Sequence, residues 1–84
     1  MSDVQELIEK GQNLVDEVKT LMKNREYNFD LTAKWELKSD CKEIERYIKL
    51  IFSGKASEKN ITHLEKIIVH LQTIVNGLVE YYIR

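Results

Sequence analysis

The sequence predicts an all-α fold in one domain spanning residues 1 to 84, either an antiparallel three-helix bundle or a helical hairpin with a long third helix. Apolar residues recur every three or four positions, which is the period of an amphipathic helix. The chain contains no proline and only three glycines, so few positions can end a helix. The pattern is interrupted near residues 23 to 30 and 53 to 57. We therefore expect helices over residues 3 to 23, 30 to 52 and 58 to 83, with short connections that make neighbours antiparallel.

The first predicted helix begins with a capping box, in which Ser2 accepts from the amide of Gln5 and the Gln5 side chain reaches back. Its apolar residues fill heptad positions a, d and e, the stripe that a core-facing helix requires. Gly11 occupies one a position on this stripe, where glycine costs about 1 kcal/mol relative to alanine. Two explanations stay open: another helix approaches closely at Gly11, or the glycine is a tolerated imperfection.

The second predicted helix is capped by Asn28 or Asp30 and ends before Gly54, which is suited to the left-handed conformation beyond a helix end. Its core stripe has spacings of three and four residues and comprises Ala33, Leu37, Cys41, Ile44, Ile48 and Ile51. Ser57 or Asn60 caps the third helix. These signals place both ends of the second helix and the start of the third.

The third predicted helix is apolar around most of its circumference. An unbroken series holds heptad positions a and d: Ile61, Leu64, Ile68, Leu71, Val75, Leu78 and Tyr82. Val69, Val79 and Ile83 lie outside that stripe, and two partner helices cannot readily cover every apolar position of such a helix. Leftover apolar surface usually marks an interface. The pattern predicts a homo-oligomer or docking on a protein partner, through Val69, Val79, Tyr82 and Ile83.

The composition argues against several classes of partner. Thirteen basic and fourteen acidic side chains leave a net charge of −1, which disfavours nucleic-acid binding. No segment has the roughly 20 apolar residues that span a bilayer. The first six residues are acidic rather than basic and lack the apolar core of a signal sequence, so none is expected. The single cysteine, Cys41, fits a reducing compartment. We expect a cytoplasmic protein, in the host cytoplasm if a phage encodes it, with no membrane partner.

The side chains that carry chemistry form no catalytic or metal-binding pattern. His63 and His70 are seven residues apart on one helix, about 10 Å, whereas chelation by one helix needs ligands three or four residues apart. They are expected to lie half-exposed beside the apolar stripe. Cys41 lies on the apolar face of its helix, where burial raises a thiol pKa. We therefore expect no enzyme, no metal and no cofactor.

One row of cations is a candidate anionic-ligand face: Lys34, Lys38, Lys42 and Arg46 follow one another at four-residue steps. Aromatic residues at one end of the row, namely Tyr27, Phe29 and Trp35, could offer a flat surface for a base while the cations bind phosphate. The alternative is an ordinary solvated face, with Trp35 and Phe29 closing the end of the core. The sequence leaves both interpretations open.

The stretch Gln5-Glu6-Leu7-Ile8-Glu9-Lys10-Gly11-Gln12-Asn13-Leu14 resembles the opening of a helical hairpin in phage-encoded cyclic-nucleotide sponges of the anti-CBASS and anti-Thoeris type. Asp30 and the pair Ser39-Asp40 fall where that hairpin carries an acid and a Thr-Asp-like step. The resemblance covers residues 4 to 54 and assigns no ligand-binding residue. It implies an oligomeric binder that sequesters a signalling nucleotide without cleaving it, an anti-defence role.

Three functions follow as expectations. The first is a non-enzymatic helical interaction protein that self-associates and binds a partner, such as a phage or plasmid regulator or inhibitor. The second is the oligomeric sponge for a cyclic nucleotide. The third is a bacteriocin-immunity-type protein, an analogy that rests on size and fold class.

Overall fold

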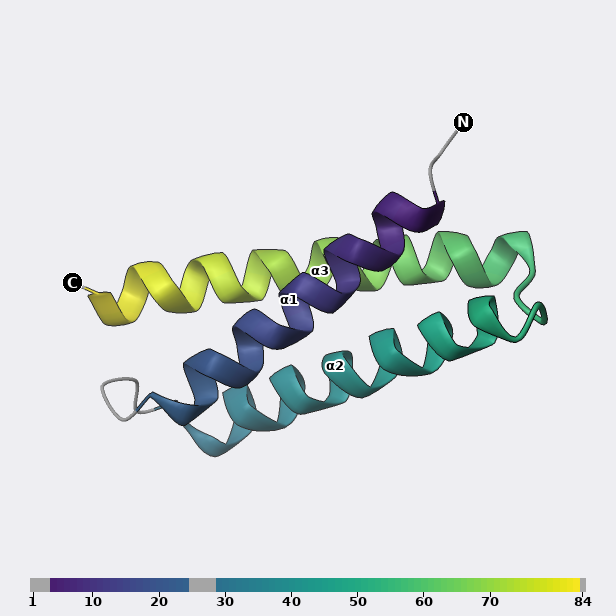
Figure 1. The fold of residues 1–84 in the computed structure, drawn as a ribbon. Helices are drawn as coiled ribbons and strands as arrows, with labels where there is room; N and C mark the ends of the chain where they lie inside the picture. Colours follow the sequence, from purple (N-terminus) through teal and green to yellow (C-terminus); the bar gives the residue numbers. More distant parts are fainter. Residues whose placement is uncertain (1–3, 25–28, 84) are drawn as a thin grey trace.

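The computed structural model describes residues 4 to 24 and 29 to 83, with side chains as far as residue 78. It contains three helices, α1 (Val4–Lys23), α2 (Leu31–Phe52) and α3 (Glu58–Ile83), and no strand within the described residues. Each helix packs against the other two. α2 runs antiparallel to α1 and α3, and α1 crosses α3 at an angle (Figure 1). The predicted all-α bundle is confirmed, and the described helix ends agree with the predicted ones to within one residue.

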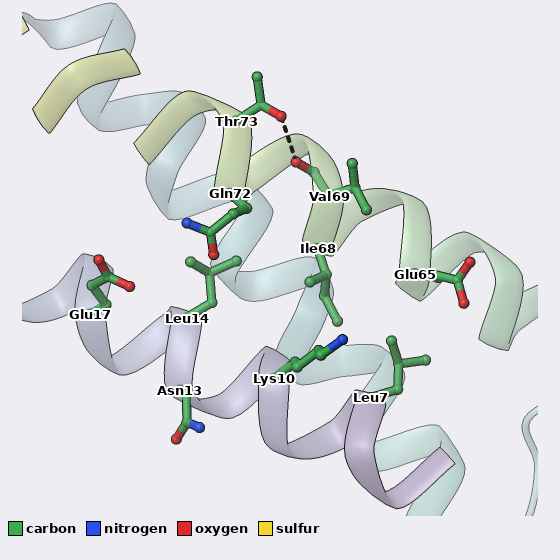
Figure 2. Close-up of a pocket in the computed structure, with 10 residues that line it drawn as sticks. All are labelled: Leu7, Lys10, Asn13, Leu14, Glu17, Glu65, Ile68, Val69, Gln72 and Thr73. Carbon is green, nitrogen blue, oxygen red and sulfur yellow. Dashed lines mark hydrogen bonds between the residues drawn. The ribbon is translucent and has the colours of Figure 1, made fainter. Parts of the chain in front are cut away.

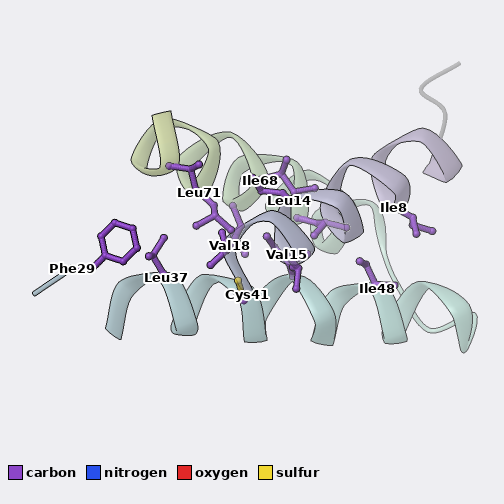
Figure 3. Close-up of a cluster of buried hydrophobic side chains, with 14 residues drawn as sticks. Ile8, Leu14, Val15, Val18, Phe29, Leu37, Cys41, Ile48, Ile68 and Leu71 are labelled. Atoms are coloured by element: carbon purple, nitrogen blue, oxygen red, sulfur yellow. The ribbon is translucent and has the colours of Figure 1, made fainter. Parts of the chain in front are cut away.

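The core consists of the apolar stripes of the three helices. Over the described residues every buried side chain is apolar or is the Cys41 thiol, and no polar or charged side chain is buried. The members of the cluster are Ile8, Leu14, Val15, Val18, Phe29, Leu37, Cys41, Ile44, Ile48, Leu64, Ile67, Ile68, Leu71 and Val75. Phe29, from the α1–α2 connection, lies at one end of this cluster (Figure 3). Burial of apolar surface therefore supplies the main stabilisation of the fold.

At Gly11, α1 approaches the other two helices closely. A Cβ atom at this position would lie 3.0 Å from Cγ2 of Ile44 and 3.3 Å from Cδ1 of Ile68. Cδ1 of Ile48 would be 3.4 Å away. The distances to Ile44 and Ile68 are shorter than ordinary packing allows, because carbon atoms prefer separations of about 3.5–4.0 Å. Of the two explanations that the sequence left open, the structure supports close approach of other helices.

The predicted helix ends are confirmed where the structure describes them. Oδ1 of Asp30 accepts a hydrogen bond from the amide of Ala33 at 2.7 Å, which caps α2. Gly54 has a φ of 75°, and the amides of Gly54 and Lys55 donate to carbonyls of the last turn of α2. The Ser57 hydroxyl accepts from the amide of Asn60 at 3.3 Å. Ser57 is therefore the cap of α3, and the alternative Asn60 is its donor. The Gln5 side chain, expected to reach back to Ser2, instead donates to Oε1 of Glu9 at 3.5 Å. Ser2 and Asn28 lie outside the described residues.

The apolar surplus expected on α3 is smaller than its sequence suggests. Ile67 is buried and Ile74 half-buried, because α1 and α2 pack against α3 from two directions and cover a wide arc. Among the described side chains of α3, Val69 is the one exposed apolar residue, at 61 %. The side chains of the other expected interface residues, Val79, Tyr82 and Ile83, lie outside the described set. The other large exposed apolar side chains of the described residues belong to α2: Leu31, Trp35 and Phe52.

Candidate interaction surfaces

The outward side of α2 combines exposed apolar side chains with cations. Leu31, Trp35, Lys38 and Lys42 follow one another at steps of four, three and four residues, which places them along one side of a helix. We call these four residues the α2 ridge. Leu31 is 85 % and Trp35 72 % exposed, and both lysines are exposed. The core residues of α2, such as Leu37 and Ile44, occupy the opposite side of the helix.

The predicted row of cations is exposed along its whole length. Arg46 differs from the others, because its guanidinium lies 3.3 Å from Oε1 of Glu43 and 5.0 Å from the centre of the Tyr47 ring. Within the described part of the chain, no carboxylate forms an ion pair with Lys34, Lys38 or Lys42. The three lysines therefore keep their charges available to a partner.

The aromatic residues beside this row do not form one surface. Phe29 is buried, at 3 % exposure, and closes the end of the core, whereas Trp35 points into solvent. The alternative that both residues close the core is therefore confirmed for Phe29 and wrong for Trp35. The reason is helical geometry: Trp35 comes two positions before the buried Leu37, and residues two apart lie on nearly opposite sides of a helix. Tyr27 lies outside the described residues.

A groove between α1 and α3 is the second candidate surface. It has a volume of about 660 Å³, and α2 passes behind the two helices that form it (Figure 2). Its apolar lining residues are Leu7, Leu14, Ile68 and Val69, and its polar ones are Lys10, Asn13, Glu17, Glu65, Gln72 and Thr73. The Thr73 hydroxyl donates to the carbonyl of Val69 at 2.9 Å, so it is engaged within its own helix. We call this feature the α1–α3 groove.

The two histidines join α3 to α2. Nδ1 of His70 lies 2.9 Å from Oδ2 of Asp40, and Nε2 of His63 lies 3.7 Å from Oε2 of Glu43. His63 also meets the Tyr47 ring edge-on, with the ring centres 5.2 Å apart. The sequence placed both histidines beside the apolar stripe but gave no sign of these partners, since the register between α2 and α3 is a tertiary property. Across the described residues, no group of three histidine, cysteine or acidic side chains could hold a metal ion.

The Cys41 thiol faces the core and is a poor nucleophile. Burial, followed by the nearby Glu45 carboxylate, raises the pKa of Cys41 from 9.0 to about 11. The thiol therefore stays protonated at neutral pH, and the thiolate is the reactive form. This arrangement supports a packing role for Cys41.

We expect Cys41 to react with iodoacetamide at pH 8 far more slowly in the folded chain than in urea. Folding both covers the thiol and raises its pKa, so alkylation has to await opening of the bundle. Mass spectrometry of timed samples measures the two rates, and free cysteine in the same urea solution serves as the control. Equal rates for the folded and the unfolded chain would contradict this placement.

No protein-family model matches the chain, and neither a curated protein nor a solved structure is significantly similar to it. Within the described residues, none of the helices combines the length and apolarity that a bilayer crossing requires.

Proposed function

We propose that this chain is a non-enzymatic helical interaction protein, which binds further copies of itself through apolar surface that its own bundle leaves uncovered. The observation that carries the proposal is the exposure of Leu31 and Trp35, at 85 % and 72 %. Both side chains extend from a helix whose opposite side already fills the core. The single chain therefore leaves most of the area of these two apolar side chains in water.

The composition of the α2 ridge supports an interface. Tryptophan is enriched among the residues that contribute most to binding energy at protein interfaces, and large aromatic anchors are surrounded there by polar residues. Trp35 has this arrangement, with Leu31 one turn before it and Lys38 and Lys42 after it. A partner that covers Trp35 would remove a large apolar area from water.

The surroundings of Cys41 and of the two histidines support a role without catalysis. Cys41 is buried and protonated, and the two histidines contact acidic residues of α2. A general acid or base usually works in a concave site that also positions a substrate. The α1–α3 groove is lined by Lys10, Glu17 and Glu65 with no histidine or cysteine beside them.

The nucleotide-sponge hypothesis receives less support from this geometry. Lys34, Lys38, Lys42 and Arg46 lie along the convex side of a helix, and none of them lines the α1–α3 groove or the smaller groove between α1 and α2. Small-ligand sites are generally concave and bury most of the ligand. A nucleotide site at this row would therefore require a second copy of the chain to close it.

Sedimentation velocity over a concentration series tests the proposal. We expect the mean mass of the native chain to rise between about 1 μM and about 1 mM, since interfaces of moderate quality bind in this range. Trp35→Ala is expected to move the rise to higher concentration. Phe52→Ala, which removes another exposed aromatic side chain of α2, is the matched control. A mass of one chain throughout the series would refute self-association.

A further inference from the structure

We infer that the chain associates head to tail: the α2 ridge of one copy lies in the α1–α3 groove of the next. This inference rests on the proposed self-association and adds the two surfaces that meet. It commits to a second copy of this chain as the occupant of the groove. The argument comes from the placement of the two surfaces, their lengths and their chemistry.

The ridge and the groove lie on opposite sides of the bundle. In a bundle of three helices, the groove between two helices is across from the third, and α2 passes behind the groove in Figure 2. The ridge occupies the side of α2 that faces away from the core. One copy can therefore use both surfaces at the same time without a clash between its two neighbours.

The two surfaces have matching lengths. Leu31 and Lys42 are eleven residues apart, so the ridge is about 16 Å long. The groove follows α1 from Leu7 to Glu17, a distance of about 15 Å. A helix placed between two others completes a four-helix arrangement, in which apolar side chains of one helix fit between those of its neighbours. With its ridge in the groove, α2 of one copy can thus act as the fourth helix beside α1 and α3 of the next copy.

The chemistry of the two surfaces is complementary. Leu31 and Trp35 would meet the apolar lining of the groove, which Val69 extends to the surface with 61 % of its area exposed. The charged residues of the groove are two carboxylates, Glu17 and Glu65, and one ammonium group, Lys10. The ridge carries Lys38 and Lys42, and none of its four members is acidic. Opposite charges at the rim favour this pairing and disfavour contact of two ridges with each other.

An interface between two different surfaces has a distinctive consequence. A pair joined head to tail still has one free ridge and one free groove, so further copies add until the assembly closes into a ring or continues as an open chain. Two variants that each lack a different surface should then be unable to assemble alone. Mixed together, they retain one intact ridge and one intact groove, which can form a single contact.

A complementation experiment tests the inference directly. Trp35→Glu disrupts the ridge, and Val69→Lys places a cation in the apolar part of the groove that Leu31 and Trp35 of the ridge would meet. Both positions are exposed, and surface substitutions rarely disturb folding. We expect each variant alone to associate at least about 30-fold more weakly than the native chain. An equimolar mixture is expected to form a 1:1 dimer, seen by sedimentation velocity, and nothing larger.

The controls are exposed residues that belong to neither surface: Phe52→Glu on α2 and Thr62→Lys on α3. Both are expected to assemble as the native chain does. A mixture that stays monomeric, or a single variant that assembles normally, would overturn the head-to-tail arrangement while leaving self-association through another surface in place. A native chain that is monomeric at every concentration would overturn both proposals. Circular dichroism of each variant checks that it is folded.

Discussion

Replacement of Gly11 by valine is expected to destabilise the fold by about 3 kcal/mol. Even a single Cβ at this position would lie 3.0 Å from Ile44, and valine adds two further methyl groups. The better helix propensity of valine returns only a few tenths of a kcal/mol, so the steric conflict dominates. Chains of this size are stable by about 4–12 kcal/mol, and the loss should be plain in a urea unfolding curve.

Gly77 supplies the matched control for this prediction. It also lies within a helix, but a Cβ there would have no neighbour within 4 Å. Gly77→Ala is therefore expected to stabilise the chain by about 0.5–1 kcal/mol, the usual gain from glycine to alanine in an exposed helix. If Gly11→Val were as stable as the native chain, Ile44 would have to move aside freely, and the close approach of α1 and α2 would be wrong.

Leu37→Ala is expected to lower the free energy of unfolding by about 2–5 kcal/mol. Leu37 is fully buried, so the loss of its side chain leaves a cavity among the three helices. Leu31→Ala, on the same helix, is expected to change stability by about 0.5 kcal/mol or less, because Leu31 is already exposed to water. Urea unfolding followed by circular dichroism measures both changes.

These unfolding measurements require concentrations at which the chain is monomeric, since association adds apparent stability. The informative quantity is the difference between the changes in unfolding free energy that Leu37→Ala and Leu31→Ala cause, because both substitutions remove the same atoms. A large cost for Leu31→Ala in the monomer would show that Leu31 packs within its own chain, and the α2 ridge would then lose its apolar end.

The fold was predictable from the sequence because its determinants are local. The three- and four-residue spacing of apolar residues sets each helix face, and Asp30, Gly54 and Ser57 act on the backbone of their own or the next turn. Gly11 was ambiguous for the opposite reason. Its closest neighbours, Ile44 and Ile68, come from two other helices, and nothing in the sequence of α1 specifies how near they lie.

The candidate surfaces were predictable only in part. The exposed row of cations on α2 follows from helical spacing, and so does the exposure of Val69. The apolar surplus was expected on α3, yet α1 and α2 together bury Ile67 and half-bury Ile74. The exposure of Trp35 and Leu31 depends on which arc of α2 faces the core. Large apolar side chains on the other arc resemble core residues in the sequence alone.

The emission of Trp35 measures the central claim most directly, because this side chain is the only tryptophan and lies in the middle of the proposed interface. A dilute sample should emit at the long wavelength typical of tryptophan in water. As the concentration rises, we predict a shift to shorter wavelength over the same range in which the sedimenting mass increases. Emission that stays at the long-wavelength position while the mass increases would contradict the account, since the copies would then be meeting through another surface.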